Sequence, residues 1–543
     1  MDRVTRSGSL LPKASRLVAP PRLAALSSRP RMAAMALGLL AALGFPPVGL
    51  WPVSLLAIGS LAWLIRSAPS TREAAIIGWF FGIAHFTLAN NWIATAFTYQ
   101  AEMPMVLGWF AVPLLSLYLG LYPALASAIG YRLGRKTSFL IGGVGFAGAW
   151  TVSEWLRGWV FTGYAWDPLG LVLLGPFDRP GLAALLPWLG TYALSGLAVV
   201  LGVGMVTLLR EKRLVAAFLI AALIAIGMYL PGPKIIEGTL PYTLIQPNIA
   251  QEELNDASQF ENQFQRIARL SARREQVERR LVLWPESGVP DYLRDGYPQR
   301  YYNQMTAAGD PAFARYRIGR TIGDGSLLLT GAVDLEIENG RAIGARNAVT
   351  AIRSDGMIVG GYDKAHLVPG GEYLPLRQIL EPLGASRLVA GALDFFPGPG
   401  PQTLPLGPWG KAGVQICYEI VFSGQVADRT NRPDYIFNPS NDGWFGSWGP
   451  PQHLAQARMR AIEEGLPVLR STTTGISAVI DANGLVRSHI GMQRPGRIDG
   501  LVPPALPPTW FARVGNLLPL AWALVCVIIA LAGSLVATRP GRR

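Results

Sequence analysis

Cys417 has the clearest capacity for covalent chemistry in this 543-residue chain. It follows the apolar run Ala-Gly-Val-Gln-Ile at 412–416, which is typical of a buried strand, and Tyr418 and Glu419 come next. The only other cysteine, Cys526, lies in a long hydrophobic stretch, so we expect neither a disulfide nor a paired-cysteine metal site. A thiol that ends a strand beside charged residues is a candidate nucleophile, although the local sequence is equally compatible with a core cysteine.

Two other segments place an ionisable side chain directly after an apolar run, Glu286 after 281–285 and Lys364 after 361–363. A thiol is only a few per cent ionised at neutral pH, so Cys417 needs a base, and the carboxylate of Glu286 can serve. Lys364 can donate to the oxyanion that forms when the thiolate attacks a carbonyl, together with the backbone N–H that follows Cys417. Singly, Glu286 and Lys364 are more typical of surface or ion-pair residues. As a set with Cys417, they form a candidate catalytic triad.

No metal or cofactor is expected. The four histidines show neither an HExxH pattern nor clustered ligand spacing, and the sequence carries no P-loop or other nucleotide fingerprint.

The composition is that of a membrane protein. Half of the residues are hydrophobic and only 15% are charged, against about 25% in a typical soluble protein. A helix needs about 20 residues to cross a bilayer. We expect about eight spans, at 33–47, 48–65, 74–97, 104–131, 138–157, 183–209, 214–231 and 515–537. The first two are short and are divided by Phe45-Pro46-Pro47, so a re-entrant pair or one broken helix is an alternative.

Lysine and arginine predict the orientation of these spans, because short cytoplasmic loops accumulate them. They gather in the arm 1–32, after the second, fourth and sixth spans and in the last five residues, whereas 98–104 has none. Both termini are therefore expected in the cytoplasm and the segment between the last two spans outside. Topology and anionic lipid largely explain the net charge of +13. Nucleic-acid binding is not expected, because the cations are scattered over short loops.

The loop at 159–179 between the fifth and sixth spans carries Trp159, Trp166 and Phe177. We expect these rings to act as ordinary interfacial anchors.

The segment 238–510 has the composition of a soluble domain. Apolar, β-rich runs recur at 239–249, 281–284, 326–333, 345–352, 413–417, 435–438, 467–472 and 476–481, and helical spacing occurs at 259–277 and 451–464. This mixture predicts an α/β domain with two sheets covered by helices. The expected organisation is a basic cytoplasmic arm (1–32), a bundle of seven spans (33–237), the soluble domain (238–510) and a final span with its tail (511–543).

The order Glu286, Lys364, Cys417, in the contexts WPES, YDKAHLVP and QICYE, resembles the nitrilase superfamily. More closely, the chain is similar to the apolipoprotein N-acyltransferases, in which a nitrilase-like domain lies on the outer side of an eight-helix membrane bundle. The similarity includes KAHLVPGGEYLP at 364–375, NDGWFG at 441–446, GPPQHL at 449–454, RMRAIE at 458–463 and EWLRG at 154–158. It implies a polytopic helical bundle joined to an α-β-β-α sandwich.

The resemblance also implies a two-stage acyl transfer in the bacterial inner membrane, with the catalytic domain in the periplasm. Glu286 deprotonates Cys417, which takes an acyl chain from the sn-1 position of a phospholipid such as phosphatidylethanolamine and holds it as a thioester. The N-terminal amine of a diacylated apolipoprotein, a diacylglyceryl-cysteine lipoprotein, then attacks. Lys364 stabilises the oxyanion in both halves.

Further positions match the family's pattern. Glu372 is expected to orient Lys364 or to share proton handling, and Tyr418 and Glu419 are expected to shape the acyl or amine pocket. Trp444 and Phe445 suit an apolar wall for a lipid tail. Ordinary surface or packing roles are the alternatives for these residues.

Two positions depart from the family's pattern: Asn255 stands where a tryptophan is common, and Gly370 where an aromatic is usual.

Two other functional classes remain open. One is a membrane-tethered nitrilase-type amidase or hydrolase, in which water resolves the thioester. The other is a transporter or receptor whose outer domain only binds a ligand.

Overall fold

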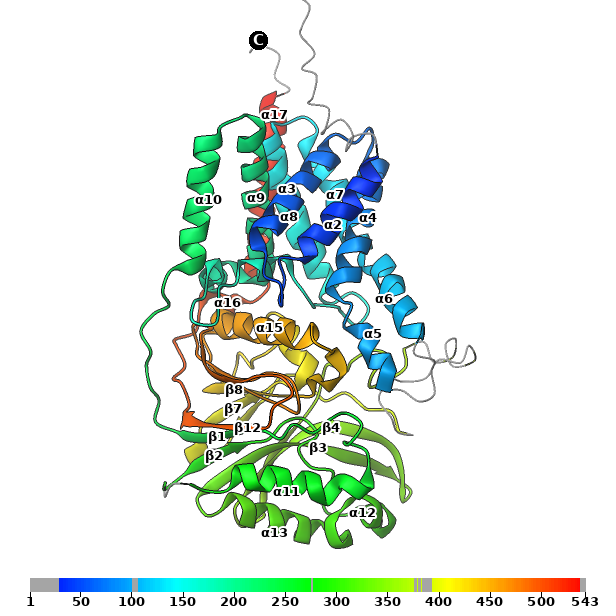
Figure 1. Ribbon diagram of the computed structural model, residues 1–543, viewed down its shortest axis with the longest axis vertical. Coiled ribbons are helices and arrows are strands. Elements are labelled where there is room, and N and C mark those ends of the chain that lie inside the picture. The colour runs from blue at the N-terminus through cyan, green and yellow to red at the C-terminus, as the bar shows by residue number, and fades with distance from the viewer. Residues whose placement is uncertain are drawn as a thin grey trace, which may run out of the picture.

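The computed structural model of the protein describes residues 29–99, 106–274, 277–375 and 393–537, together with 378 and 382. The molecule is elongated and layered, with a helical bundle at one end and two β-sheets with their covering helices at the other (Figure 1). Most of the arm 1–32, the tail 538–543 and residues 100–104 of the loop without cations, on which the orientation prediction rests, lie outside the described residues.

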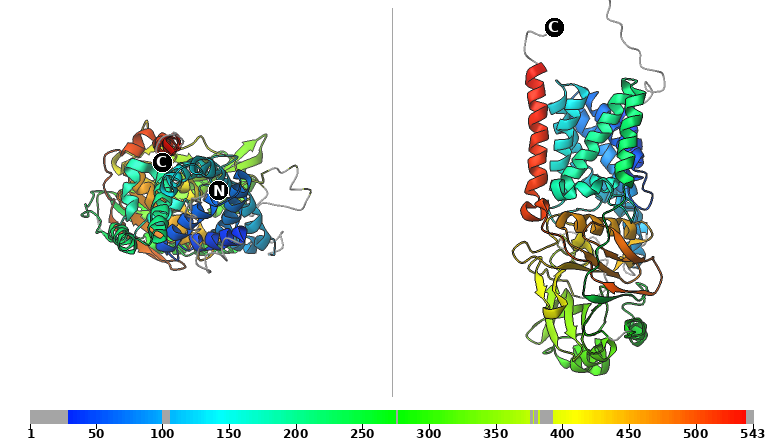
Figure 2. Two further views of the ribbon diagram at one scale, coloured as in Figure 1. Left: turned by 90° about the horizontal axis from the view of Figure 1, so that it is seen from above. Right: turned by 90° about the vertical axis from the view of Figure 1, so that its left-hand side faces the viewer.

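The helices of the bundle follow the predicted spans. They are α2 (Pro30–Ala42), α3 (Trp51–Arg66), α4 (Thr71–Ala89), α5 (Ile93–Ala96), α6 (Val106–Leu119), α7 (Leu121–Gly134), α8 (Phe139–Arg157), α9 (Leu186–Arg210), α10 (Leu214–Tyr229) and α17 (Leu517–Ala537). Figure 2 shows α17 running along one side of the bundle. Among the described residues, three segments are long and apolar enough to cross a membrane: Val106–Gly134, Leu182–Arg210 and Leu517–Ala537. The count of about eight spans therefore stays a prediction.

The first two predicted spans are separate helices. α2 has 13 residues, which corresponds to about 20 Å, and this is shorter than the roughly 30 Å of a bilayer's hydrocarbon core. Turns around Phe45 separate α2 from α3. In these turns the backbone N–H groups of Phe45 and its neighbours donate hydrogen bonds to carbonyls one turn earlier in the chain.

The soluble part contains two six-stranded sheets. The first has the order β12-β1-β2-β3-β4-β5 and the second β11-β10-β9-β8-β7-β6. The strands are β1 (Pro241–Gln246), β2 (Arg280–Leu283), β3 (Ser326–Glu338), β4 (Arg341–Arg353), β5 (Ile358–Asp363), β6 (Thr403–Pro405), β7 (Lys411–Val414), β8 (Tyr435–Ser440), β9 (Val468–Thr472), β10 (Ser477–Ile480), β11 (Val486–Ile490) and β12 (Gly496–Leu501). Each predicted strand is confirmed. β5, β6, β11 and β12 were not predicted.

The centre of each sheet is parallel, and this arrangement positions the chemistry. β1, β2 and β3 run parallel in the first sheet, and β7, β8 and β9 run parallel in the second. Parallel strands have their carboxyl ends at one edge, so residues that follow β2, β7 and β8 can meet there. Leucine, valine and phenylalanine side chains of both sheets form one core between them, including Leu283, Val414 and Phe437.

Helices cover the outer face of each sheet. α11 (Phe260–Ser271), α12 (Gln299–Met305) and α13 (Pro311–Ile322) lie over the first sheet at the end remote from the bundle (Figure 1). α15 (Gly449–Glu464) lies between the second sheet and the bundle (Figure 1). The predicted two-sheet α/β domain covered by helices is confirmed.

α15 is buried over almost its whole length, because it packs on the sheet with one face and on the bundle with the other. Its buried polar side chains bond to bundle residues. Glu463 accepts hydrogen bonds of 2.6 Å from both the backbone N–H and the hydroxyl of Thr191 in α9. Gln452 donates to the carbonyl of Ala89 at 3.1 Å and accepts from the indole N–H of Trp166 at 2.8 Å.

The expectation that Trp166 is an interfacial anchor is wrong. Its ring is 0% exposed, because it lies between the bundle and the domain and contacts Trp92 and Tyr418. Trp159 and Phe177 are 50% and 40% exposed, as an anchor requires.

Glycines allow α3 and α9 to touch backbone to backbone. A Cβ on Gly59 would lie 2.2 Å from the carbonyl oxygen of Gly202. A Cβ on Gly202 would lie 2.2 Å from the carbonyl oxygen of Leu55. A side chain at either position must therefore separate the helices.

We expect Gly59→Leu and Gly202→Leu each to destabilise the protein by about 1–3 kcal/mol. Thermal unfolding in detergent measures the change. Gly204→Leu is the control, because a Cβ there meets nothing within 4 Å. Equal melting temperatures for all three variants would contradict the close packing.

Candidate active site

Cys417 lies in a sharp turn at the carboxyl end of β7. It is the first residue of the short 3₁₀ helix η8 (Cys417–Val421) and is 5% exposed. Its φ of +51° is in the left-handed region, which a residue other than glycine adopts only at a cost. The carboxylate of Glu419 accepts a 2.7 Å hydrogen bond from the backbone N–H of Ile416 and so holds the turn.

Glu419 also joins this turn to the segment that carries Lys364. Its second carboxylate oxygen accepts hydrogen bonds from the hydroxyl of Tyr362 at 2.8 Å, the N–H of Ala365 at 2.8 Å and the N–H of His366 at 3.1 Å. Glu419 therefore positions the two chain segments relative to each other behind the thiol.

Lys364 is buried between two carboxylates. Its Nζ is 3.0 Å from Glu372 and 3.8 Å from Oε1 of Glu286, and its side chain is 1% exposed. Burial lowers the pKa of Lys364, but the charges of Glu372 and Glu286 outweigh this effect and raise its pKa above the ordinary value. The ammonium therefore stays charged at neutral pH.

Asn347, in β4, is a site residue that the sequence did not reveal. Its Nδ2 donates to Oε1 of Glu286 at 2.7 Å and to Oε1 of Glu372 at 2.8 Å. Its backbone carbonyl accepts from the N–H of Lys364 at 2.8 Å. The available signal was a polar side chain inside the predicted strand 345–352.

The outer oxygens of the two carboxylates accept backbone N–H groups. Oε2 of Glu286 accepts from Asn441 at 2.7 Å, and Oε2 of Glu372 accepts from Val368 at 2.8 Å. Both carboxylates are thus fixed on both sides, which leaves them little rotational freedom.

The thiol of Cys417 is protonated in this environment. Burial raises its pKa well above the ordinary value, and the charge of Glu286 raises it further, whereas Lys364 lowers it. A nucleophile of this kind needs a base at the moment of attack. Glu286 is the carboxylate of the predicted triad that acts electrostatically on it.

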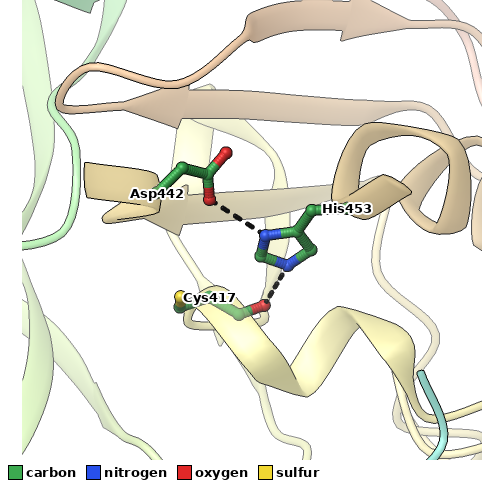
Figure 3. A group of neighbouring side chains, drawn as sticks. All are labelled: Cys417, Asp442 and His453. Atoms are coloured by element: carbon green, nitrogen blue, oxygen red, sulfur yellow. Dashed lines mark hydrogen bonds and ion pairs between the residues drawn. The ribbon is translucent and has the colours of Figure 1, made fainter. Parts of the chain in front are cut away.

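His453 holds the backbone of Cys417. Figure 3 shows its ring between Asp442 and Cys417. Nε2 is 3.0 Å from the carbonyl oxygen of Cys417, which can only accept, so this nitrogen donates. Nδ1 lies 2.9 Å from Oδ1 of Asp442 and 3.0 Å from Nη2 of Arg470. Arg470 donates to both carboxylate oxygens of Asp442, at 2.7 and 2.9 Å. Burial raises the pKa of Asp442, but the charges and hydrogen bonds of Arg470 and His453 together outweigh this effect, so its pKa is lowered.

Potential ligand atoms of Cys417, Asp442 and His453 lie within 4.8 Å of one another. A cation there would have to displace the guanidinium of Arg470 from Asp442 and the carbonyl of Cys417 from His453. The donor set therefore fits a hydrogen-bonded support better than a metal site. The spacing of the histidines in the sequence gave no sign of this cluster.

Aromatic rings from both parts of the chain contact one another beside Tyr418, the residue that follows Cys417. Phe445 contacts Trp92 of the bundle at a ring distance of 4.6 Å, and Trp444 contacts Tyr99 at 5.8 Å. Tyr418 stacks on Trp166 at 6.3 Å. Trp444 and Phe445 thus form part of an apolar wall between domain and bundle.

The two positions that depart from the family's pattern lie in loops. Gly370 has a φ of +76°, two residues before Glu372, and a Cβ there would meet nothing within 4 Å. Asn255 is exposed.

Comparison with known proteins gives matches along both parts of the chain. Residues 37–204 match the family described as apolipoprotein N-acyltransferase N-terminal domain, and residues 243–495 match the carbon-nitrogen hydrolase family. The chain is 34% identical over 531 residues to the apolipoprotein N-acyltransferase of Rhodopseudomonas palustris, covering 93% of this chain and 94% of that protein. It is 34% identical over 526 residues to that of Bradyrhizobium diazoefficiens, covering 92% and 94%. Among solved structures, an amidase from Nesterenkonia sp. AN1 is 17% identical over 52% of this chain and 100% of that chain, with a TM-score of 0.35.

We expect Asn347→Ala to slow acylation of Cys417 about 10- to 100-fold, because two hydrogen bonds to charged groups are lost. Asn347→Asp should be worse, because it adds a third carboxylate around Lys364. Single-turnover acyl-enzyme formation measures the effect. Asn303→Ala, in the exposed helix α12, is the control. Loss of stability with an unchanged acylation rate would contradict a positioning role.

The rate of alkylation of Cys417 by iodoacetamide should rise with pH. The rate should reach half its maximum at a pH above the pKa of free cysteine, about 8.5, because burial raises the pKa of this thiol. Lys364→Met should move the profile to still higher pH, since Lys364 lowers that pKa. Mass spectrometry of a Cys526→Ala background measures the rate. A wild-type midpoint below pH 8 would contradict the protonated thiol.

Proposed function

The chain belongs to the apolipoprotein N-acyltransferase family, and from this premise we propose that it moves a fatty acyl chain from a phospholipid to the N-terminal amine of a lipoprotein through a thioester on Cys417. The observation that carries the assignment of residues is the buried cluster of Glu286, Lys364 and Glu372 that adjoins Cys417. The donor is a phosphatidylethanolamine-like phospholipid and the acceptor a diacylated apolipoprotein.

In the first half, Glu286 takes the thiol proton as Sγ of Cys417 attacks the ester carbonyl of the donor. Lys364 and the backbone N–H of Tyr418 donate to the oxyanion. The carbon–sulfur bond forms, the ester carbon–oxygen bond breaks, and the proton on Glu286 passes to the departing lysophospholipid.

In the second half, the α-amine of the acceptor attacks the thioester, and Glu286 takes a proton from the nitrogen. Lys364 again stabilises the oxyanion. As the carbon–sulfur bond breaks, the thiolate of Cys417 recovers its proton, and the amide product leaves. A thioester is reactive enough for an amine without any activated nucleotide.

The structure supports a membrane location for this chemistry. The site adjoins Trp92 and Trp166 at the base of the bundle, so lipid substrates confined to a bilayer meet it by two-dimensional diffusion. α2 begins and α17 ends at the bundle end remote from the sheets (Figure 1). We place that end in the cytoplasm of a bacterial inner membrane and the domain 238–510 in the periplasm.

The membrane-tethered amidase or hydrolase is the alternative. It uses the same triad but resolves the thioester with water. The full-length match to apolipoprotein N-acyltransferases, bundle included, favours the amine.

Cys417→Ala should abolish the acyl-enzyme. Cys417→Ser should also be inactive, because Glu286 is a poor base for a hydroxyl group. Glu286→Gln should form no thioester on wild-type time scales. Intact mass after incubation with labelled phospholipid detects the intermediate, and Cys526→Ala is the matched control.

The complete reaction distinguishes the two functions. With a diacylated lipopeptide present, the acyltransferase yields N-acylated peptide. Release of free fatty acid with no acylated peptide would show the hydrolase instead.

A further inference from the structure

A groove with a volume of about 590 Å³ lies at the carboxyl end of α15, the opposite end of this helix from His453. It is formed where α9 begins, where α15 ends and at the short helix α16 (Trp510–Val514). Trp188, Trp510, Thr509 and Arg513 line it, together with Pro233. The reaction described above does not use it.

The groove lies at the level where membrane helices emerge. Leu182–Arg210 and Leu517–Ala537 are both long and apolar enough to span, and the groove includes the start of the first and the residues just before the second. Trp188 and Trp510 are 54% and 59% exposed. Exposed tryptophans at the ends of spans are typical of the lipid head-group region.

The charge at the groove is positive and unpaired. The guanidinium of Arg513 lies 5.5 Å from the ring centre of Trp510. It forms no ion pair with any carboxylate in the described part of the chain, and neither does Lys234, which follows Pro233 and is exposed. Glu237, three residues after Lys234, is paired with Arg487, and Asp178 and Asp481 are also paired with arginines.

We propose that this groove binds an anionic phospholipid at a site separate from the substrate site. The phosphate pairs with Arg513, whose planar fork suits two phosphate oxygens. Lys234 adds a second positive charge, so the site prefers a lipid with net negative charge over a zwitterionic one. The acyl chains follow the apolar surface of α17, where Leu517 is 73% exposed.

The position of the groove gives the lipid a structural effect. The hydroxyl of Thr509 donates to the carbonyl of Glu463, whose carboxylate holds Thr191 of α9. A lipid bound here contacts both sides of the junction between bundle and domain. Because it binds only the docked arrangement, it stabilises the folded protein.

Native mass spectrometry tests the proposal on the full chain in detergent, titrated with phosphatidylglycerol or with phosphatidylethanolamine. The wild type should bind one phosphatidylglycerol in preference, with a higher melting temperature in its presence. Arg513→Gln should weaken that binding roughly fivefold, as expected for one charge near a lipid surface. Trp510→Ala should weaken it as well.

Arg300→Gln is the matched control, because it removes the same charge from the exposed helix α12, far from the bundle. Cys417→Ala should bind phosphatidylglycerol as the wild type does, which separates this site from the acyl-donor site and from the proposed function. Equal binding of the two lipids, or unchanged binding by Arg513→Gln, would overturn the proposal and show only ordinary surrounding lipid.

Discussion

The buried ammonium of Lys364 is the constraint on which the site depends. An ion of this kind costs several kcal/mol to remove from water unless it is paired and fully hydrogen-bonded. Glu286 and Glu372 supply the pairing, but two carboxylates around one cation repel each other. Asn347 offsets this repulsion by donating to both, and backbone N–H groups fix their remaining oxygens. The result is a rigid group of one ammonium, one amide and two carboxylates.

This group lies beside Cys417 only when the two sheets pack together. Glu286 and Lys364 follow strands of the first sheet, whereas Cys417 follows a strand of the second. Glu419 closes the gap through backbone N–H groups on both sides of it. On the bundle side, His453 fixes the carbonyl of Cys417 in its strained turn. The geometry of the thiol is therefore set by contacts across the domain rather than by its own strand.

The sequence could predict candidate site residues that follow apolar runs, because the end of a strand has a recognisable local sequence pattern. Glu286, Lys364 and Cys417 were predicted in this way. The structure pairs Lys364 with Glu286, and the charges of both act on the thiol of Cys417. Asn347 could not be found, because a polar residue inside a strand is ordinarily a surface residue. The partners of His453 come from two further elements, η9 (Asp442–Phe445) and β9, so sequence spacing does not reveal them. The burial of Trp166 depends on how the bundle meets the domain, which no local pattern encodes.

A transferase that pauses as a thioester must keep water away until the amine arrives. Cys417 is 5% exposed. His453, which binds its carbonyl, contacts the rings of Trp166 and Phe445, and both of these rings contact Trp92 of the bundle. Because these rings come from both parts of the chain, separating the domain from the bundle would open the packing around His453. The bundle therefore contributes more than an anchor: its rings complete the packing around the histidine that supports the backbone of Cys417.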